Sequence, residues 1–351
     1  MISEQLLKLV RCPECRAQLS RRPEASGVFV CSGCGREYRG ADDYLDMRPI
    51  EQFTERTKYL DEALHADARH ERVSPPLLGS KIRNDMLRRF LDPGPDDLVV
   101  DLGCGSGRTL LWNRDLGSSS VGIDISPFFS TEARRDVDLL LGDLRRLPFA
   151  DGTFTKAWSL DVLEHLSPDA LRAMLREAAR VLKPGGALFV YTHVRKNAPI
   201  AAGLRAINTL ARQLERLGLI DMRQERLRKS DHVNPLRDIP DLERVARDTG
   251  FRIARIRYYT PIVGGLVENI LMRMAERAMA KRAARRLRGS VPAQDEEAAA
   301  IRAARSSAKA HIARNPGTLA VLRGLSAAMK LDLLLFGRVR SGPFFALLVK
   351  E

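Results

Sequence analysis

The stretch LVVDLGCGSGRTLLW, residues 98–112, decides the fold. It begins with a short apolar run, passes through a turn with glycine at 103, 105 and 107, and ends in a segment that can form a helix. A buried parallel strand has such a run, and glycine lets a ligand approach the backbone at a helix N-terminus. The stretch predicts a strand, a ligand-binding turn and a helix, a combination that dinucleotide dehydrogenases also use.

The residues that follow repeat the alternation of strand and helix. Asp124 closes the next apolar run about twenty residues past the turn, where a carboxylate can accept hydrogen bonds from ribose hydroxyls. Such alternation predicts a doubly wound, seven-stranded α/β Rossmann-like sheet with ligands at the carboxyl ends of its strands. Further strands are expected in residues 119–126, 137–149, 151–161, 187–193, 251–261 and 343–350.

This series of motifs, from about Lys81 to Phe251, resembles the class I S-adenosylmethionine-dependent methyltransferases. The similarity is to the small-molecule group that includes the ubiquinone and menaquinone biosynthesis enzymes. The resemblance implies that S-adenosylmethionine is the cofactor and that Asp124 holds its ribose, with Asp143 and Leu144 at the adenine. A Rossmann-like core that binds no cofactor is the alternative. The implied cofactor-binding residues are Asp101, Gly103, Cys104, Gly105, Gly107, Asp124, Ile125, Asp143, Leu144 and Leu160.

Four of the five cysteines form two C-x-x-C pairs near the start of the chain. Cys12, Cys15, Cys31 and Cys34 have the spacing C-x2-C-x15-C-x2-C, which is typical of a tetrahedral zinc site. Four thiolates leave no position for water, so this spacing predicts a structural Zn2+ and not a catalytic one. A redox dithiol is the alternative. The segment resembles zinc ribbons of the tRNA-methyltransferase-activator type and of the rRNA guanine methyltransferases.

Three histidines follow predicted strands or precede a predicted helix, where ligands are expected. His165, His193 and His232 are candidates for the general base that removes a proton from an acceptor hydroxyl, because histidine titrates near neutral pH. Asp161, which would lie beside the methyl group with Leu160, could orient a histidine or the acceptor. Structural, hydrogen-bonded histidines are the alternative. Cys104 is expected to be a small buried residue and not a nucleophile.

The net charge of +14 favours an anionic partner. Residues 262–351 hold 16 Lys and Arg against 7 Asp and Glu, or +9, and their helical periodicity suggests basic amphipathic helices on an anionic membrane surface. In the last of them, Arg323, Ser326 and Lys330 form a narrow polar stripe. Packing within the domain, a homodimer contact and RNA binding are the alternatives. Aromatic residues, which RNA-binding segments often interleave with basic ones, are missing from residues 276–290.

The sequence predicts five segments. They are a zinc ribbon at 1–48, a linker with the first helix at 49–79, the methyltransferase core at 80–261, a basic helical insertion at 262–340, and a closing strand at 341–351. A lid insertion is expected at about 195–231. The start of the chain has no secretory signal pattern and no apolar run reaches 18 residues, which predicts a cytoplasmic protein, peripheral on the cytoplasmic face of the membrane.

The predicted function is methyl transfer from S-adenosylmethionine to a small-molecule or lipid-like acceptor, at oxygen. Two alternatives stay open. One is an rRNA or tRNA methyltransferase that uses the ribbon to dock RNA, and the other is a non-catalytic, cofactor-binding regulatory partner.

Overall fold

The structure is a computed structural model. It describes residues 2–48 except 24, 26, 41 and 42, residues 73–195, residues 201–222, residues 226 and 230, residues 232–278, and residues 315–351 except 341. Residues 49–72 of the predicted linker at 49–79, and the basic run at 281–288, lie outside these residues.

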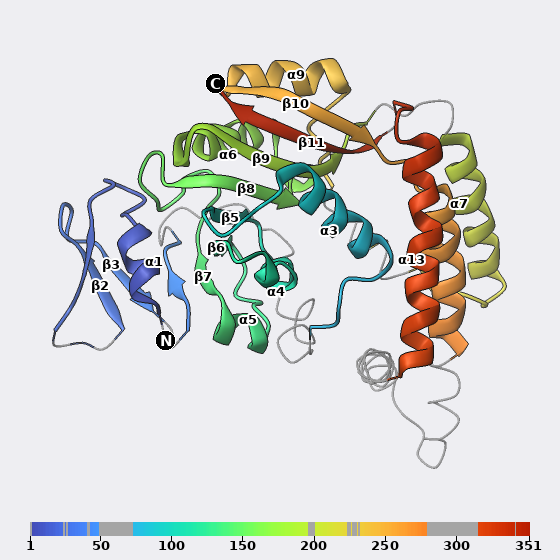
Figure 1. The fold of residues 1–351 in the computed structure, drawn as a ribbon, viewed down its shortest axis with the longest axis horizontal. Helices are drawn as coiled ribbons and strands as arrows, with labels where there is room; N and C mark the ends of the chain where they lie inside the picture. Colours follow the sequence, from blue (N-terminus) through green and yellow to red (C-terminus); the bar gives the residue numbers. More distant parts are fainter. Residues whose placement is uncertain are drawn as a thin grey trace, which may run out of the picture.

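One sheet of eleven strands runs through the molecule, in the order β1-β2-β3-β4-β7-β6-β5-β8-β9-β11-β10 (Figure 1). The predicted seven-stranded core is the part from β7 to β10, in which β11 is antiparallel to both of its neighbours. Its strands are β5 (Leu98–Leu102), β6 (Ser119–Asp124), β7 (Asp138–Leu141), β8 (Phe154–Leu160), β9 (Leu182–His193), β10 (Phe251–Tyr258) and β11 (Pro343–Lys350).

Helices cover both faces of this core, as a doubly wound fold requires. α6 (Pro168–Val181) and α9 (Ile239–Asp248) pack on one face, and α3 (Leu78–Leu91) packs on the other. α6 begins where the Ser167 hydroxyl accepts the N–H of Ala170, and the buried side chains on one side of the helix join the core. The short helices that connect the parallel strands are α4 (Arg108–Trp112), η2 (Arg114–Leu116), α5 (Thr131–Asp136) and η3 (Leu163–His165).

The cysteine-rich segment is not separate from the sheet. Its fourth strand pairs in parallel with β7, Leu45 opposite Leu140 and Asp46 opposite Leu141. The ribbon therefore extends the core sheet by four strands, which lengthens the predicted seven-stranded sheet to eleven. Its elements are α1 (Glu4–Leu9), β1 (Leu19–Arg21), β2 (Val28–Cys31), β3 (Glu37–Gly40) and β4 (Leu45–Asp46).

A helical layer lies on the side of the molecule opposite the ribbon (Figure 1). In this layer α10 contacts both α7 and α13, and η4, which follows α10, contacts α7. Asp332 of α13 is fully buried and accepts the N–H groups of Val263 (2.9 Å) and Gly264 (2.8 Å), which joins α13 to α10. The elements of this layer are α7 (Ala201–Arg216), α10 (Ile262–Gly265), the π-helix η4 (Leu266–Leu271) and α13 (Pro316–Phe336).

Two residues of the polar stripe of α13, Ser326 and Lys330, contact the rest of the protein, whereas Arg323 is exposed. The buried Ser326 hydroxyl accepts the N–H of Leu78 at 2.7 Å, and Lys330 Nζ lies 2.6 Å from Asp85 Oδ2 of α3. Large apolar side chains of the same helix face outward instead, with Leu334 73% and Leu335 61% exposed. In the part of the chain that the structure describes, no helix has the length and apolar character needed to cross a bilayer.

Candidate functional site

A cavity of about 1310 Å³ opens at the carboxyl ends of the parallel strands, the edge at which ligands bind in this class of fold. One half, which we call the cofactor half, is lined by the glycine turn and the ends of β6 and β7. The other, the acceptor half, is lined by η3, the end of β9, α7 and η4. The predicted site residues that line it are Asp101, Gly103, Cys104, Gly105, Asp124, Ile125, Asp143, Leu144, Leu160, Asp161, His165, His193 and His232.

The glycine turn is held against β6 by its backbone, because the N–H groups of Gly103 and Cys104 both donate to the carbonyl of Ile123. All three glycines have positive φ. A Cβ on Gly105 would meet no atom within 4 Å, so this residue leaves the backbone open to a ligand. A Cβ on Gly107 would lie 2.6 Å from Ala133 Cβ, and Gly107 is not among the lining residues, so it serves packing between α4 and α5.

Asp101 has a buried carboxylate oxygen, Oδ2, with no hydrogen-bond partner among the described residues. Burial raises the pKa of Asp101 to about 7, and the negative charge of Asp124 adds to this shift. A buried polar atom without a partner is costly, and a bound ammonium group would satisfy it. The residue therefore fits the amino group of the methionine part of S-adenosylmethionine.

Asp124 lies at the end of β6, with its two oxygens directed by the backbone. Oδ2 accepts the N–H of Gly105 at 2.7 Å, and Oδ1 accepts the N–H of Ser126 at 2.9 Å. Burial raises the pKa of Asp124, and these donors oppose that shift. Each oxygen has a second lone pair, so the carboxylate fits the two ribose hydroxyls. Ile125 follows it on the cavity wall.

The part of the cavity wall that follows β7 contains an arginine, Arg145, that the sequence did not single out. Asp143 accepts the N–H of Arg145 at 2.9 Å and forms an ion pair with the Arg145 guanidinium at 2.8 Å. Arg145 and Leu144 both line the cavity. The pair holds the Asp143 carboxylate at the cavity wall after β7.

A second arginine, also absent from the predicted residues, reaches the end of β8. Arg83 of α3 lies 3.3 Å from Asp161, measured between Nε and Oδ2, and its guanidinium carbon lies 5.4 Å from the Tyr191 ring centre. Burial alone would lower the pKa of Arg83, but the negative charge of Asp161 raises it, so the group is cationic. Asp161 has φ +57°, a left-handed backbone conformation that the surrounding structure must hold in place.

The three predicted histidines gather on one wall of the cavity. The His165 and His232 ring centres are 4.6 Å apart and those of His193 and His232 are 5.4 Å apart. All three rings are partly buried. Side chains from η3, the end of β9 and the loop before α9 thus meet beside the cofactor half.

Glu164 lies behind these histidines and is buried. Its carboxylate accepts the Thr192 hydroxyl at 2.9 Å, and its backbone carbonyl accepts the N–H groups of Val233 and Asn234. Burial raises the pKa of Glu164 to about 8, and the negative charge of Asp161 adds to the shift. A buried carboxyl in the acceptor half can form a hydrogen bond with a substrate or bind a cation.

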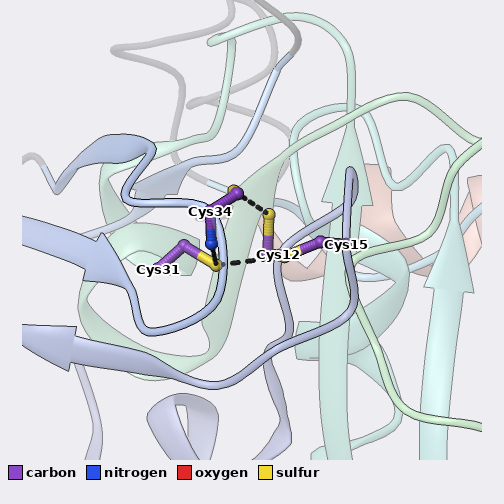
Figure 2. Close-up of side chains that lie close together, drawn as sticks. All are labelled: Cys12, Cys15, Cys31 and Cys34. Atoms are coloured by element: carbon purple, nitrogen blue, oxygen red, sulfur yellow. Dashed lines mark hydrogen bonds between the residues drawn. The ribbon is translucent and has the colours of Figure 1, made fainter.

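The four ribbon cysteines point toward one another from two loops (Figure 2). The Sγ atoms are 3.7 Å apart for Cys12 and Cys34 and 3.2 Å apart for Cys15 and Cys31. A tetrahedron with zinc–sulfur bonds of about 2.3 Å places its sulfurs about 3.8 Å apart, so the cluster fits a zinc ion. Burial opposes ionisation of Cys31, but the N–H of Cys34 and the Cys15 thiol outweigh it and lower its pKa to about 6.

The end of the ribbon reaches the cofactor side of the cavity. The Tyr44 ring packs edge to face on Phe129 at 5.4 Å, and Asp43 pairs with Arg134 of α5 at 2.8 Å. Arg48 donates to the carbonyl of Ile125, a residue of the cavity wall, at 3.4 Å. The cysteine-rich segment thereby contacts the strand and loop that border the cofactor half.

Comparisons with known proteins agree with this geometry. The family model described as "Methyltransferase domain" matches residues 100–190. A demethylmenaquinone methyltransferase of Corynebacterium kroppenstedtii is 43% identical over 104 residues, which are 29% of this chain and 44% of that protein. "Probable tRNA methyltransferase 9B" of Mus musculus is 36% identical over 108 residues, 30% of this chain and 24% of that protein. The chain thus spans less than half the length of these relatives.

Among solved structures, Haemonchus contortus phosphoethanolamine N-methyltransferase 2 in complex with S-adenosyl-L-methionine aligns over 85% of this chain and 59% of that one. The two are 18% identical, with a TM-score of 0.46. Strand order, glycine turn and family match together identify residues 100–190 as part of a class I S-adenosylmethionine-dependent methyltransferase domain.

Proposed function

We propose that the protein transfers a methyl group from S-adenosylmethionine to an oxygen of a small-molecule or lipid-like acceptor, at a membrane surface. The carrying observation is the single cavity that joins the glycine turn and Asp124 to the wall of three histidines. In this proposal Asp101 binds the methionine ammonium, Asp124 the ribose and Asp143 the adenine. S-adenosylmethionine, when bound there, supplies a methyl group on a positively charged sulfur.

The chain's own part in the reaction is to orient the acceptor and to remove its proton. A hydroxyl placed between the Leu160–Asp161 turn and the histidine wall can donate its proton to an imidazole nitrogen, because histidine titrates near neutral pH. Cys104 takes no part, since burial raises the pKa of its thiol and keeps it neutral.

The acceptor half has room for an acceptor with both polar and apolar parts, because Glu268, Asn269 and Arg273 line it beside apolar side chains. Leu204 and Asn208 of α7 and Met272 after η4 line it, so the helical layer forms one of its walls. This position supports the lid that the sequence predicted for the α7 segment. A wall built from a helical layer can admit a long apolar chain from the membrane side.

Membrane association is supported by the exposed apolar side chains of that layer. Among the described residues of α7, η4, α13 and the segments directly after α7 and η4, ten large apolar side chains are exposed. Basic side chains are exposed nearby in the sequence, at Arg323, Arg338 and Arg340. Apolar side chains flanked by basic ones suit an anionic lipid surface. The apolar residues are Leu210, Leu217, Leu219, Leu266, Leu271, Met274, Val321, Leu331, Leu334 and Leu335.

Incubation of the protein with cell extract and methyl-labelled S-adenosylmethionine tests the proposal. We expect the label in the organic phase, resistant to alkali as an ether is and lost with Asp124→Asn. Label in RNase-sensitive material would establish the second candidate, RNA methylation, which the similarity to a tRNA methyltransferase and the net charge of +14 favour. Absence of label from the organic phase, from RNase-sensitive material and from water-soluble small molecules would contradict a catalytic role.

A further inference from the structure

The acceptor half of the cavity contains a second group of potential metal ligands, apart from the four cysteines. One ligand atom each from Glu164, His165 and His232 lies within 4.8 Å of the other two. Glu164 and His165 are adjacent in η3, whereas His232 comes from the loop before α9, more than sixty residues later.

Hydrogen bonds fix these two segments to each other. The Glu164 carbonyl accepts the N–H groups of Val233 at 2.8 Å and Asn234 at 2.9 Å, directly after His232. On the other side, the Thr192 hydroxyl donates to the Glu164 carboxylate at 2.9 Å. A hydrogen-bond donor to a ligating carboxylate orients it and is a common support in metal sites. The positions of the three ligands are thus determined by the backbone and by β9.

The separations suit an ion of transition-metal size. Nitrogen and oxygen ligands about 2.1 Å from a metal lie about 3.4 Å apart in a tetrahedron, so a small rotation of the partly buried imidazoles closes the site. The His165 and His232 rings stand at 88° to each other, 4.6 Å between centres, so neither ring is stacked flat on the other. Glu164 is only 3% exposed, which keeps its carboxylate out of bulk water.

We propose that Glu164, His165 and His232 bind a divalent transition-metal ion, such as Zn2+ or Fe2+, on the acceptor side of the cavity. Two imidazoles with one carboxylate suit these ions better than Mg2+ or Ca2+, which prefer oxygen ligands. Three protein ligands leave positions open toward the cavity. His193 lies beside His232 but outside the cluster.

The consequence for the acceptor rests on the proposed O-methylation. An ion held by Glu164, His165 and His232 would act as a Lewis acid toward an acceptor hydroxyl at an open position, and His193 on the same wall would accept the proton of that hydroxyl. Asp161 and the Arg83 guanidinium border the same space and limit the orientation of the acceptor.

Cobalt titration of the full-length protein loaded with a single equivalent of Zn2+, which the four ribbon thiolates bind in preference to two imidazoles and a carboxylate, tests the site without any acceptor or methyl transfer. With the ribbon filled by zinc, we expect one further equivalent of Co2+ to bind, with visible absorption but without thiolate-to-cobalt charge transfer. His165→Asn and His232→Asn should each weaken this binding at least about 100-fold, since each removes a ligand. His193→Asn, the matched control on the same wall, should keep it.

Each result decides the question. No further equivalent of Co2+, charge-transfer bands of cobalt in the ribbon alone, or unchanged binding in the His165→Asn and His232→Asn proteins would overturn the site. Unchanged S-adenosylmethionine affinity of the two variants shows that they fold. Because cobalt binding is measured apart from turnover, a failure of O-methylation leaves this result standing, and a failure of the metal site leaves O-methylation standing.

Discussion

Arg83 and Asp161 form an ion pair, 3.3 Å from Nε to Oδ2, that ties α3 to the turn at the end of β8. Asp161 holds a left-handed backbone conformation, φ +57°, at the place where the acceptor and the cofactor half meet. The side chains are 24% and 46% exposed, respectively, so the pair is partly screened by solvent. We interpret it as the contact that positions the floor of the acceptor half.

Loss of this pair should have a moderate effect on stability. Arg83→Met removes the charge with similar bulk and should lower the free energy of unfolding by about 1.5 kcal/mol. Denaturant unfolding of Arg83→Met, Asp161→Asn and the double variant measures the coupling. Strictly additive effects would show that the two side chains do not interact in solution.

S-adenosylmethionine affinity should rise with pH through the titration of Asp101. Its raised pKa of about 7 leaves the carboxyl largely neutral at pH 6, and ionisation above pH 7 creates the charge that pairs with the methionine ammonium. Between pH 6 and pH 8 the affinity should increase about tenfold. Calorimetric titrations over this range test it, with Asp101→Asn as the variant whose profile is flat. A wild-type affinity independent of pH would refute the role of Asp101.

Removal of the ribbon's zinc should affect the methyltransferase core. Cys31→Ser should lower the free energy of unfolding by more than about 4 kcal/mol, as loss of a structural metal does. It should also weaken S-adenosylmethionine binding several-fold, because β4 pairs with β7 directly before Gly142 and Asp143. Ser32→Ala, an exposed residue of the same loop, is the control. A variant with an unfolded ribbon and unchanged cofactor affinity would separate the two parts.

The outward leucines of α13 should determine membrane binding. Leu334→Glu with Leu335→Glu should reduce partition into anionic vesicles more than about tenfold, since each buried leucine contributes about 1.5 kcal/mol or more. Sedimentation with phosphatidylserine vesicles measures this. Ala254→Glu, exposed on β10, adds an acidic residue away from the helical layer and should leave partition unchanged. Equal partition of the double variant and wild type would exclude this face as the membrane contact.

The sequence predicted the core of the fold well because its signals are local. Apolar runs, the glycine turn and Asp124 at a strand end each indicate their own local structure, and the C-x-x-C pairs indicate the cluster of four cysteines. The pairing of β4 with β7 could not be predicted, since a two-residue strand has almost no pattern and joins a partner about ninety residues away.

The arginines of the site were missed for a similar reason. Arg83 lies in a helix with Arg88 and Arg89, and nothing in the spacing distinguishes the one that faces the cavity. The face of α13 that contacts the protein could not be predicted either, because a stripe of Arg323, Ser326 and Lys330 is expected to face solvent. In the structure Lys330 forms an ion pair with Asp85, and the Ser326 hydroxyl accepts the N–H of Leu78.

The binding of S-adenosylmethionine to the full-length protein tests the central claim most directly. Isothermal calorimetry should show one site, at least about 100-fold weaker in Asp124→Asn, which keeps the size of the side chain but removes the charge and one acceptor. Lys156→Gln, whose side chain pairs with Asp97 away from the cavity, should bind as wild type does. No binding by the wild type, or equal affinity of Asp124→Asn, would contradict the assignment of the cavity to this cofactor.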